Sequence, residues 1–259
     1  MLDYLAYTDY THFPCHLSRL KWLVNIISET HNKEKKVKIL DIGCGTGNVT
    51  IPLGLIENSE VLGIDIHQPT LNIAVEKNSL PNVKFKFEYL QNCNINDYDY
   101  IILTEVLEHI DNYQAILEYI AMHAKKDMSL LITIPNGFGP FEISQQPLYL
   151  MRKIGLSPLI NTVKRLLGKK EPYSLNYEKP HVNFFTIRSL RKALIRNGMV
   201  ITRFKKAYVF APIIETYLPF IPLDTIAKID NTLAQILPAF IVSGWYFKIN
   251  KINSLNLLL

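Results

Sequence analysis

The chain has 259 residues, of which 48% are hydrophobic and 20% charged, and its formal net charge is +5. This length and composition predict a folded globular protein and exclude a disordered one. The modest positive charge permits an anionic partner but does not identify it. The three cysteines form no CxxC pair, and no apolar stretch approaches the roughly 18 residues of a membrane-spanning helix. We therefore expect a cytoplasmic protein, with peripheral membrane contact as the alternative.

Short apolar and β-branched runs alternate with helical patterns over the first half of the chain. Residues 18–30 carry apolar side chains at a helical spacing. Five strands are then expected at 37–42, 60–66, 83–87, 100–104 and 129–134, and helices at 70–78 and 112–125. This alternation predicts an α/β fold with a Rossmann-like, doubly wound, mostly parallel sheet.

The pattern changes after residue 135. Many glycines and prolines predict that 136–180 is an insertion of short helices, forming a lid or acceptor site. A helix from Thr186 and a strand over 200–210 follow, and a second insertion over 212–238 precedes a last strand at 244–249. We thus expect one domain over 1–259 with seven strands. Its parts are an N-terminal helical segment (1–36), a cofactor-binding core (37–135), the helical insertion (136–180) and a C-terminal part (181–259).

The strongest motif follows the first expected strand and reads DIGCGTG, residues 41–47. Its three glycines allow the backbone to turn sharply and to leave room for a ligand, at the start of a helix expected near Asn48. Because position 48 is Asn, the GxGxxG fingerprint of dinucleotide-binding folds is not met, which disfavours a nicotinamide oxidoreductase. Asp65 ends the next strand, about 20 residues on, where a carboxylate can reach ribose hydroxyls. An adenosine ligand without pyrophosphate is therefore favoured.

Three segments in order, ILDIGCGTGN, VLGIDIH and YDYIILTEVLEHI, resemble the motifs of class I S-adenosylmethionine-dependent methyltransferases, particularly the ubiquinone-biosynthesis O-methyltransferase type. The resemblance covers roughly residues 37 to 135. It implies S-adenosyl-L-methionine as cofactor, with the methionine part held by the loop residues Asp41, Gly43, Cys44, Gly45 and Gly47. It also implies that Asp65 binds the ribose and that Ile66 packs on the adenine. Tyr89 stands where many relatives have Asp or Asn, so the contact to the adenine amino group would come from backbone near Leu90.

Two carboxylates and an imidazole, Glu105, Glu108 and His109, follow the fourth strand. On a helical turn they would converge on one face, and their oxygen and nitrogen atoms suit a divalent cation such as Mg or Mn. With the distant His181 they resemble the metal-binding set of small-RNA 2′-O-methyltransferases, in which the cation lowers the pKa of the acceptor hydroxyl. In the alternative interpretation no metal binds, and Glu105 faces the cofactor while the other two are structural.

Without a metal, His181 or His109 could act as general base for a hydroxyl or amine acceptor, because an imidazole titrates near neutral pH. His181 is the better candidate. Apart from this base, methyl transfer from a sulfonium requires mainly that the protein position the two reactants and exclude water.

The insertions indicate the class of acceptor. Residues 148–154 and 163–170 mix aliphatic with basic side chains, and 212–238 is rich in apolar ones. Such pieces can cover a small or lipid-like acceptor, lie on a membrane surface, or merely shield the sheet. A nucleic-acid partner is disfavoured, since the basic residues alternate with aliphatic rather than aromatic ones. We expect in-line O-methylation of a small or lipid-like acceptor. An RNA 2′-O-methyltransferase and a non-catalytic cofactor-binding scaffold are the alternatives, and the oligomeric state stays open.

Overall fold

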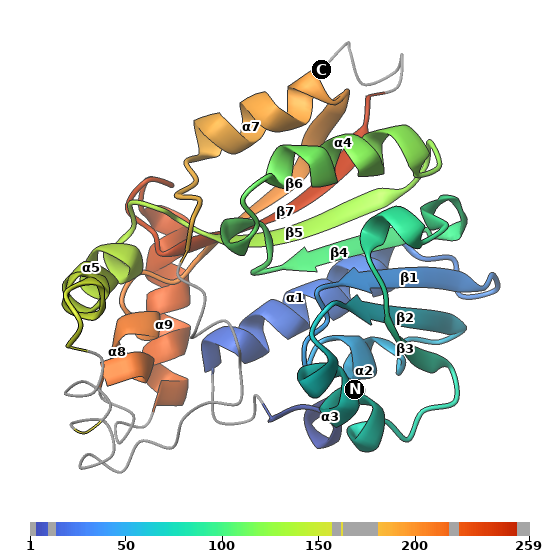
Figure 1. Ribbon diagram of the computed structural model, residues 1–259, viewed down its shortest axis with the longest axis horizontal. Coiled ribbons are helices and arrows are strands. Elements are labelled where there is room, and N and C mark those ends of the chain that lie inside the picture. Colours follow the sequence, from blue (N-terminus) through green and yellow to red (C-terminus); the bar gives the residue numbers. More distant parts are fainter. Residues whose placement is uncertain (1–3, 10–13, 157–161, 163–180, 218–222, 253–259) are drawn as a thin grey trace.

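The computed structural model describes residues 4–9, 14–156, 162, 181–217 and 223–252. Within them the chain forms a seven-stranded sheet of order β3-β2-β1-β4-β5-β7-β6 (Figure 1). The strands are β1 (Val37–Ile42), β2 (Ser59–Asp65), β3 (Val83–Phe87), β4 (Tyr100–Thr104), β5 (Ser129–Pro135), β6 (Met199–Ala207) and β7 (Gly244–Lys251). All neighbouring pairs are parallel except those of β7, which runs antiparallel to both β5 and β6. The predicted doubly wound, mostly parallel sheet is confirmed.

Helices cover both faces of this sheet (Figure 1). The α-helices of the described residues are α1 (Pro14–Thr30), α2 (Thr50–Leu53), α3 (Gln68–Lys77), α4 (Tyr113–His123), α5 (Pro140–Lys153), α7 (Ile187–Arg196), α8 (Ala211–Tyr217) and α9 (Leu223–Ile236). Helices α4 and α7 pack on one face, while α1 and α2 pack on the other. The sheet is therefore the middle layer of three.

The core divides into two apolar clusters, one on each face of the sheet. Along β1, Leu40 and Ile42 join the cluster beneath α4 and α7, whereas Val37 and Ile39 join the cluster beneath α1. Successive side chains of a strand point to opposite faces, so a strand buried on both sides is mostly apolar; in β1 the exceptions are Lys38 and Asp41. This pattern explains why the inner strands were recognisable as mostly apolar runs.

Strand β1 lies between β2 and β4 at the centre of the parallel part. From β1 the chain continues to β2 and β3 on one side, and it then returns to β4 on the other side of β1. The direction in which strands are added therefore reverses between β1 and β4, and this is the topological switch point of the sheet. In open α/β sheets, ligands bind at the carboxyl ends of the strands at such a point. The loops after β1 and β4 are those that carry the glycine motif and the carboxylate and histidine cluster.

The two insertions contain helices that the sequence did not predict in this form. Instead of short helices only, the first contains the 14-residue α5, with Pro147 inside it. Residues 163–170, whose basic and aliphatic mixture suggested a membrane or acceptor contact, lie outside the described residues. The second insertion forms α8 and α9.

Strand β6 ends at Ala207, three residues before the predicted end, and the cause is local. Tyr208 has a φ of 26°, which extended backbone does not allow. The carboxylate of Asp230 then accepts the N–H groups of Val209, Phe210 and Ala211 at 2.7 to 3.1 Å. Those donors are therefore not available for pairing with another strand.

The helices are also relevant to the membrane question. In the part of the chain that the structure describes, no helix combines the length and the apolar character needed to cross a bilayer.

Candidate active site

Three glycines in the left-handed region of backbone space shape the loop between β1 and α2. Gly43, Gly45 and Gly47 have φ of 71°, 53° and 76°, where any other residue type is strained. A Cβ on Gly43 would lie 2.8 Å from the Val106 side chain, so this loop abuts the loop after β4. A Cβ on Gly45 would meet no atom within 4 Å. The loop is therefore packed at one end and open in the middle, which leaves room for a ligand against the backbone.

Asp41 is fully buried at the end of β1. Its Oδ2 accepts a hydrogen bond of 2.6 Å from the Thr50 hydroxyl, while its Oδ1 accepts none. Burial raises the pKa of Asp41 to about 7, against a smaller lowering by the Thr50 bond. A buried carboxylate oxygen without a donor matches an ammonium group, such as that of the methionine part of S-adenosylmethionine. The donors and acceptors of this loop thus fit that cofactor.

Asp65 joins the end of β2 to the glycine loop. Its Oδ2 accepts the Gly45 N–H at 2.8 Å, and its Oδ1 accepts the His67 N–H at 2.9 Å. A carboxylate has further lone pairs, so hydroxyl donors of a ribose can still bind it. This placement agrees with the spacing of 20 residues between position 45 and position 65 in the motif.

The other predicted cofactor residues, Ile66, Leu90 and Cys44, differ in whether their side chains are accessible to a ligand. Ile66 is 53% exposed, so an apolar surface is available beside Asp65 for an adenine ring. Leu90 begins a short 3-10 helix (η3, Leu90–Asn92) and its side chain belongs to the core, which leaves only its backbone for a ligand. Cys44 is buried, and burial raises the pKa of its thiol. A reactive thiolate is therefore disfavoured there.

Glu105 does not lie on a helical turn with Glu108 and His109, and that expectation is wrong. The residue adopts a left-handed conformation with φ of 54°, and the 3-10 helix η5 (Leu107–His109) begins after it. Its Oε1 accepts a hydrogen bond of 3.0 Å from Thr133 on β5, and its Oε2 lies 3.5 Å from the Arg19 guanidinium on α1. Glu105 is thus turned toward β5 and α1.

Glu108, His109 and His181 do come together. One potential ligand atom from each lies within 4.8 Å of the others. The two imidazole rings meet edge to face with centroids 4.7 Å apart, and Nε2 of His109 is 3.9 Å from Oε1 of Glu108. Glu108 is fully buried, and neither of its carboxylate oxygens accepts a hydrogen bond. Among the described residues this group does not include Glu105.

Asn183 brings His181 to the cluster, although the two histidines are 72 residues apart in sequence. The Asn183 side chain donates to the carbonyl oxygens of Leu107 at 3.0 Å and Ile110 at 2.7 Å. The N–H groups of Val182 and Asn183 also both donate to the Glu108 carbonyl, at 2.8 and 3.1 Å. The segment after His181 is therefore fixed to η5 by four hydrogen bonds. The sequence analysis missed Asn183 because its partners are backbone groups more than 70 residues away.

A further buried carboxylate, which the sequence analysis also missed, reaches the cluster from α5. Glu142 is fully buried, and its Oε1 lies 2.9 Å from Nδ1 of His181. Neither of its oxygens accepts a hydrogen bond of favourable direction. An acidic residue in the first turn of a helix usually lies on the surface and interacts favourably with the helix dipole. Nothing in the sequence therefore distinguished Glu142 from such a residue.

The pKa of Glu108 is raised well above the usual range of a glutamate. Burial is the main cause, and repulsion from Glu105 and Glu142 adds to it, while Arg19 acts in the opposite direction. Such an arrangement is expensive for the fold unless a proton, a cation or a hydrogen-bond donor satisfies it. The cluster therefore has the properties of a site that holds or moves a proton or binds a cation.

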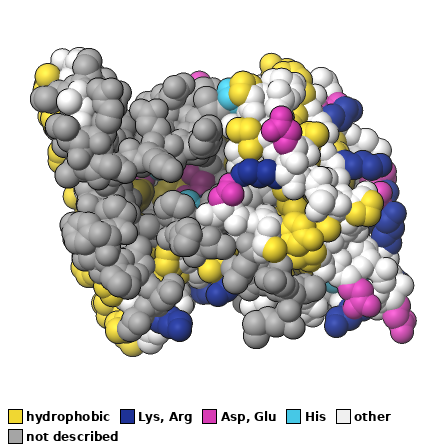
Figure 2. All heavy atoms as spheres, turned by 90° about the horizontal axis from the view of Figure 1, so that it is seen from below, with side chains coloured by type: hydrophobic (Ala, Val, Ile, Leu, Met, Phe, Trp, Pro, Cys, Tyr) yellow, Lys and Arg dark blue, Asp and Glu magenta, His cyan; other side chains and the backbone are white. Residues whose placement is uncertain are grey.

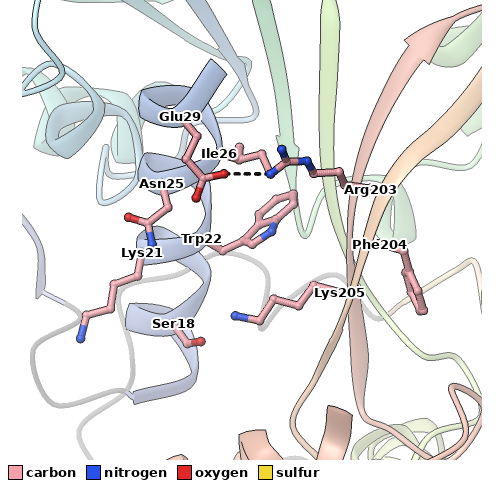
Figure 3. A pocket seen from close by; sticks show the side chains of 9 residues that line it. All are labelled: Ser18, Lys21, Trp22, Asn25, Ile26, Glu29, Arg203, Phe204 and Lys205. Carbon is pink, nitrogen blue, oxygen red and sulfur yellow. Dashed lines mark hydrogen bonds and ion pairs between the residues drawn. The ribbon is translucent and has the colours of Figure 1, made fainter. Parts of the chain in front are cut away.

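One face of the molecule is hollowed near its middle. Figure 2 shows acidic and histidine side chains inside a hollow near the middle of one face. A separate groove of about 410 Å³ lies between α1 and β6, and the Glu29–Arg203 ion pair of 2.8 Å crosses it (Figure 3). Its lining includes Trp22 and Lys205 but none of the predicted site residues. The chemistry is thus concentrated at the switch point and not in that groove.

Comparison with known proteins gives a family. A family model described as a methyltransferase domain matches residues 17–203. The malonyl-[acyl-carrier protein] O-methyltransferase of Bacillus cereus is 29% identical over 113 residues, which are 43% of this chain and 42% of that protein. The ubiquinone biosynthesis O-methyltransferase of Rickettsia prowazekii is 32% identical over 126 residues, 46% of this chain and 48% of that protein. The chain spans less than half the length of these curated relatives.

Solved structures show the same fold at low sequence identity. The geranyl diphosphate C-methyltransferase of Streptomyces coelicolor superposes with a TM-score of 0.58 and 10% identity, over 92% of this chain and 79% of that one. For a mitomycin 7-O-methyltransferase the TM-score is 0.53 and the identity 12%, over 91% of this chain and 54% of that one. The family model covers most of the chain, and the sheet order and glycine loop agree with it. The chain therefore belongs to the class I S-adenosylmethionine-dependent methyltransferase domain family.

Proposed function

We propose that the protein transfers the methyl group of S-adenosylmethionine to an oxygen atom of a small or lipid-like acceptor. The observation that carries this proposal is the contact between two loops. Val106, which lies between Glu105 and Glu108, packs against Gly43 of the cofactor loop. The cluster of Glu108, His109 and His181 and the predicted methyl donor are therefore neighbours at one edge of the sheet.

The reaction needs few groups from the protein. The acceptor oxygen attacks the methyl carbon from the side opposite sulfur, the sulfur–carbon bond breaks, and S-adenosylhomocysteine leaves. The acceptor's hydroxyl proton passes to an imidazole, for which His181 is the first candidate and His109 the second. Because the sulfonium is already an activated donor, the loops contribute mainly by holding donor and acceptor in line and excluding water.

A divalent cation is an alternative way to activate the same hydroxyl. The oxygen and nitrogen atoms of Glu108, His109 and His181 fit an ion such as Mg²⁺ or Mn²⁺, whereas the Glu105 carboxylate is bound to Thr133 and is not in this group. Such an ion would lower the pKa of a bound hydroxyl. The imidazole and cation variants share the same acceptor chemistry.

The acceptor class rests on the surroundings and on the relatives. Side chains around α5 are apolar and exposed: Phe138, Ile143 and Leu150 are each more than 60% exposed. Exposed apolar groups beside a site favour a lipid-like acceptor, or contact with a membrane surface that holds one. Both curated relatives are named as O-methyltransferases, which favours an oxygen acceptor over nitrogen or carbon.

The first test is calorimetric titration with S-adenosylmethionine, S-adenosylhomocysteine and NAD. We expect micromolar binding of the two adenosyl ligands, at least tenfold weaker binding in Asp65→Ala, and no change in the exposed control Asp127→Ala. Binding of NAD alone would overturn the cofactor assignment. Circular dichroism of each variant checks that the fold is kept.

The second test is turnover. Formation of S-adenosylhomocysteine is followed by mass spectrometry with alkyl-substituted catechols, with malonyl-acyl carrier protein and with short single-stranded RNA, each with and without Mg²⁺. Methylation of a catechol or of the malonyl carboxyl supports an oxygen acceptor, and exclusive methylation of RNA contradicts the small-molecule class. Cofactor binding without turnover on a wide acceptor panel would favour the non-catalytic scaffold.

A further inference from the structure

Glu142 is buried where the fold does not require a charge. It lies in the first turn of α5 and is fully buried, and its described polar neighbour is Nδ1 of His181 at 2.9 Å. Among the described residues no backbone N–H, hydroxyl or amide donates to either carboxylate oxygen. A structural carboxylate is satisfied differently, as Asp230 shows, because three backbone N–H groups donate to it. Glu142 therefore has the environment of a functional group and not of a cap.

The chain before Glu142 is fixed by backbone contacts. The Gly137 N–H donates to the Phe185 carbonyl at 2.9 Å, and a Cβ at position 137 would lie 2.5 Å from the backbone of Phe184. The Asn136 side chain donates to the carbonyls of Phe240 and Val242 at 3.0 and 2.7 Å. Both ends of the Glu142–His181 contact are thus anchored, since the segment that holds Gly137 is the one that follows His181.

We propose that Glu142 is a positioning residue, whose carboxylate holds the Nδ1–H of His181 and thereby leaves the lone pair of Nε2 free for the acceptor. The proposal rests on the proposed function, in which His181 takes the acceptor proton or holds a cation. A histidine that serves as a base or a ligand commonly donates its other ring N–H to a carboxylate, which fixes the tautomer and the ring orientation. The separation of 2.9 Å between Nδ1 of His181 and Oε1 of Glu142 is in the range of a charge-assisted hydrogen bond, and the proposal requires the ring to turn so that its N–H points at that oxygen.

Glu142 also connects the acceptor side with the chemistry. Helix α5 carries the exposed apolar side chains Ile143 and Leu150 beside the buried Glu142. A rotation or shift of α5 would therefore move the carboxylate that orients His181. The inference assigns to the first insertion a role in setting the geometry of the base, in addition to its role in covering the acceptor.

The test reads the tautomer of His181 directly by NMR. Protein with ¹⁵N-labelled histidine is recorded in long-range ¹H–¹⁵N correlation spectra at pH 8.5, and the His181 signals are assigned by their loss in His181→Gln. We expect a proton on Nδ1 and none on Nε2 in the wild type. In Glu142→Leu the proton is expected on Nε2, and in Glu142→Gln a mixture, since an amide can either donate or accept. Glu118→Gln, at an exposed position of α4, is the matched control and should leave the spectrum unchanged.

Three results would overturn the proposal: a wild-type His181 with its proton on Nε2, a His181 protonated on both nitrogens, or an unchanged tautomer in both Glu142 variants. If Glu142→Leu does not fold, the nearly isosteric Glu142→Gln decides alone. These spectra need neither cofactor nor acceptor, so failure of the methyl-transfer assay leaves the result readable. Where turnover is found, Glu142→Gln should lower kcat about 10- to 100-fold with an unchanged Kd for S-adenosylhomocysteine, and Glu142→Asp should restore part of it.

Discussion

The hydroxyl of Thr50 donates a hydrogen bond of 2.6 Å to one carboxylate oxygen of Asp41, and the other oxygen of that fully buried carboxylate accepts none. The pair ties the end of β1 to the first residue of α2 across the glycine loop. One oxygen of Asp41 thus fixes the geometry of the loop, and the other is available to a cationic ligand. It also makes the stability of the cofactor-free protein depend on pH.

The sign of this dependence follows from the raised pKa. Asp41 titrates at about 7 in the folded protein, mainly because of burial, against 3.8 in the unfolded chain. Between these values the folded state binds more protons, so the free energy of unfolding decreases as the pH rises from about 4 to beyond 7. Asp41→Asn removes this contribution, which is at most about 4 kcal/mol. We expect urea denaturation at pH 5 and pH 8 to show a larger loss of stability in the wild type than in the variant. Equal losses would show that Asp41 titrates normally.

A substitution at Gly45 can distinguish the effect of backbone strain on stability from the effect of an added side chain on ligand binding. Gly45→Ala and Gly198→Ala both place alanine at positive φ, 53° and 64°, with no atom within 4 Å of the new Cβ. Each should therefore destabilise the fold by a similar amount, about 1 to 2 kcal/mol. Only Gly45→Ala should weaken the binding of S-adenosylhomocysteine, by tenfold or more, as measured by calorimetry. If the two variants bind equally well, the cofactor does not approach the backbone at Gly45.

Gly47 provides a second comparison in the same loop. A Cβ at Gly47 would lie 2.9 Å from the Phe85 ring and 3.2 Å from Ala74, so Gly47→Ala adds a steric clash to the backbone strain. We expect it to lower stability by about 1 to 3 kcal/mol more than Gly45→Ala. Thermal unfolding of the two variants without cofactor measures this difference, and an equal Tm would contradict it.

Asn183 should stabilise both the fold and the position of His181. Asn183→Ala removes the side-chain donor of the Ile110 carbonyl and one of the two donors of the Leu107 carbonyl, which keeps the Ile110 N–H at 3.4 Å; the loss should cost about 1 to 3 kcal/mol. Hydrogen exchange should also become faster at the Val182 amide, which donates to the Glu108 carbonyl. Asn197→Ala is the control, because its side chain donates only to the nearby Ala193 carbonyl. Unchanged exchange at Val182 in Asn183→Ala would show that the backbone bonds alone hold the segment.

Gly137 is needed for a close approach of two chain segments. An added Cβ would lie 2.5 to 2.7 Å from backbone atoms of Phe184 and Phe185, which cannot move like the end of a side chain. We expect Gly137→Ala to lower the free energy of unfolding by about 3 kcal/mol. Gly155→Ala serves as control, since its Cβ meets no atom within 4 Å and only backbone strain applies. A loss no greater than that of the control would mean that the two segments separate easily.

The part of the fold that depends on local pattern was predictable from the sequence. Strands β1, β3 and β4 were predicted with their observed bounds. The buried strand β4 is a continuous apolar run, whereas the edge strand β3 alternates apolar residues with lysines, and both patterns are typical of strands. The glycine loop was predictable for a similar reason, since three nearby positions with positive φ require that residue type. The segment 136–156 was less predictable, because Pro147 is tolerated inside α5.

The candidate site was predictable in its residues but not in its arrangement. Histidines and glutamates are recognisable as candidates, but Glu105 is in a left-handed conformation and its side chain contacts Thr133 and Arg19, which are distant in sequence. Glu142 and Asn183 had no local signal, because each acts through a group in another part of the chain. The roles of all these residues in binding and catalysis stay predictions.

The antiparallel strand β7 has a consequence for the order in which the molecule is made. In the described sheet β6 pairs only with β7, which comes later in the chain, and the β7 pairing continues as far as Lys251. During synthesis the first five strands can pair as they leave the ribosome, whereas β6 has no neighbouring strand until residues 244–251 are translated. The cofactor half of the sheet can thus form early, and the half that carries α8 and α9 is completed only when β7 has been made. A nascent chain stalled before residue 244 would hold the glycine loop on paired strands and expose an unpaired β6 to aggregation.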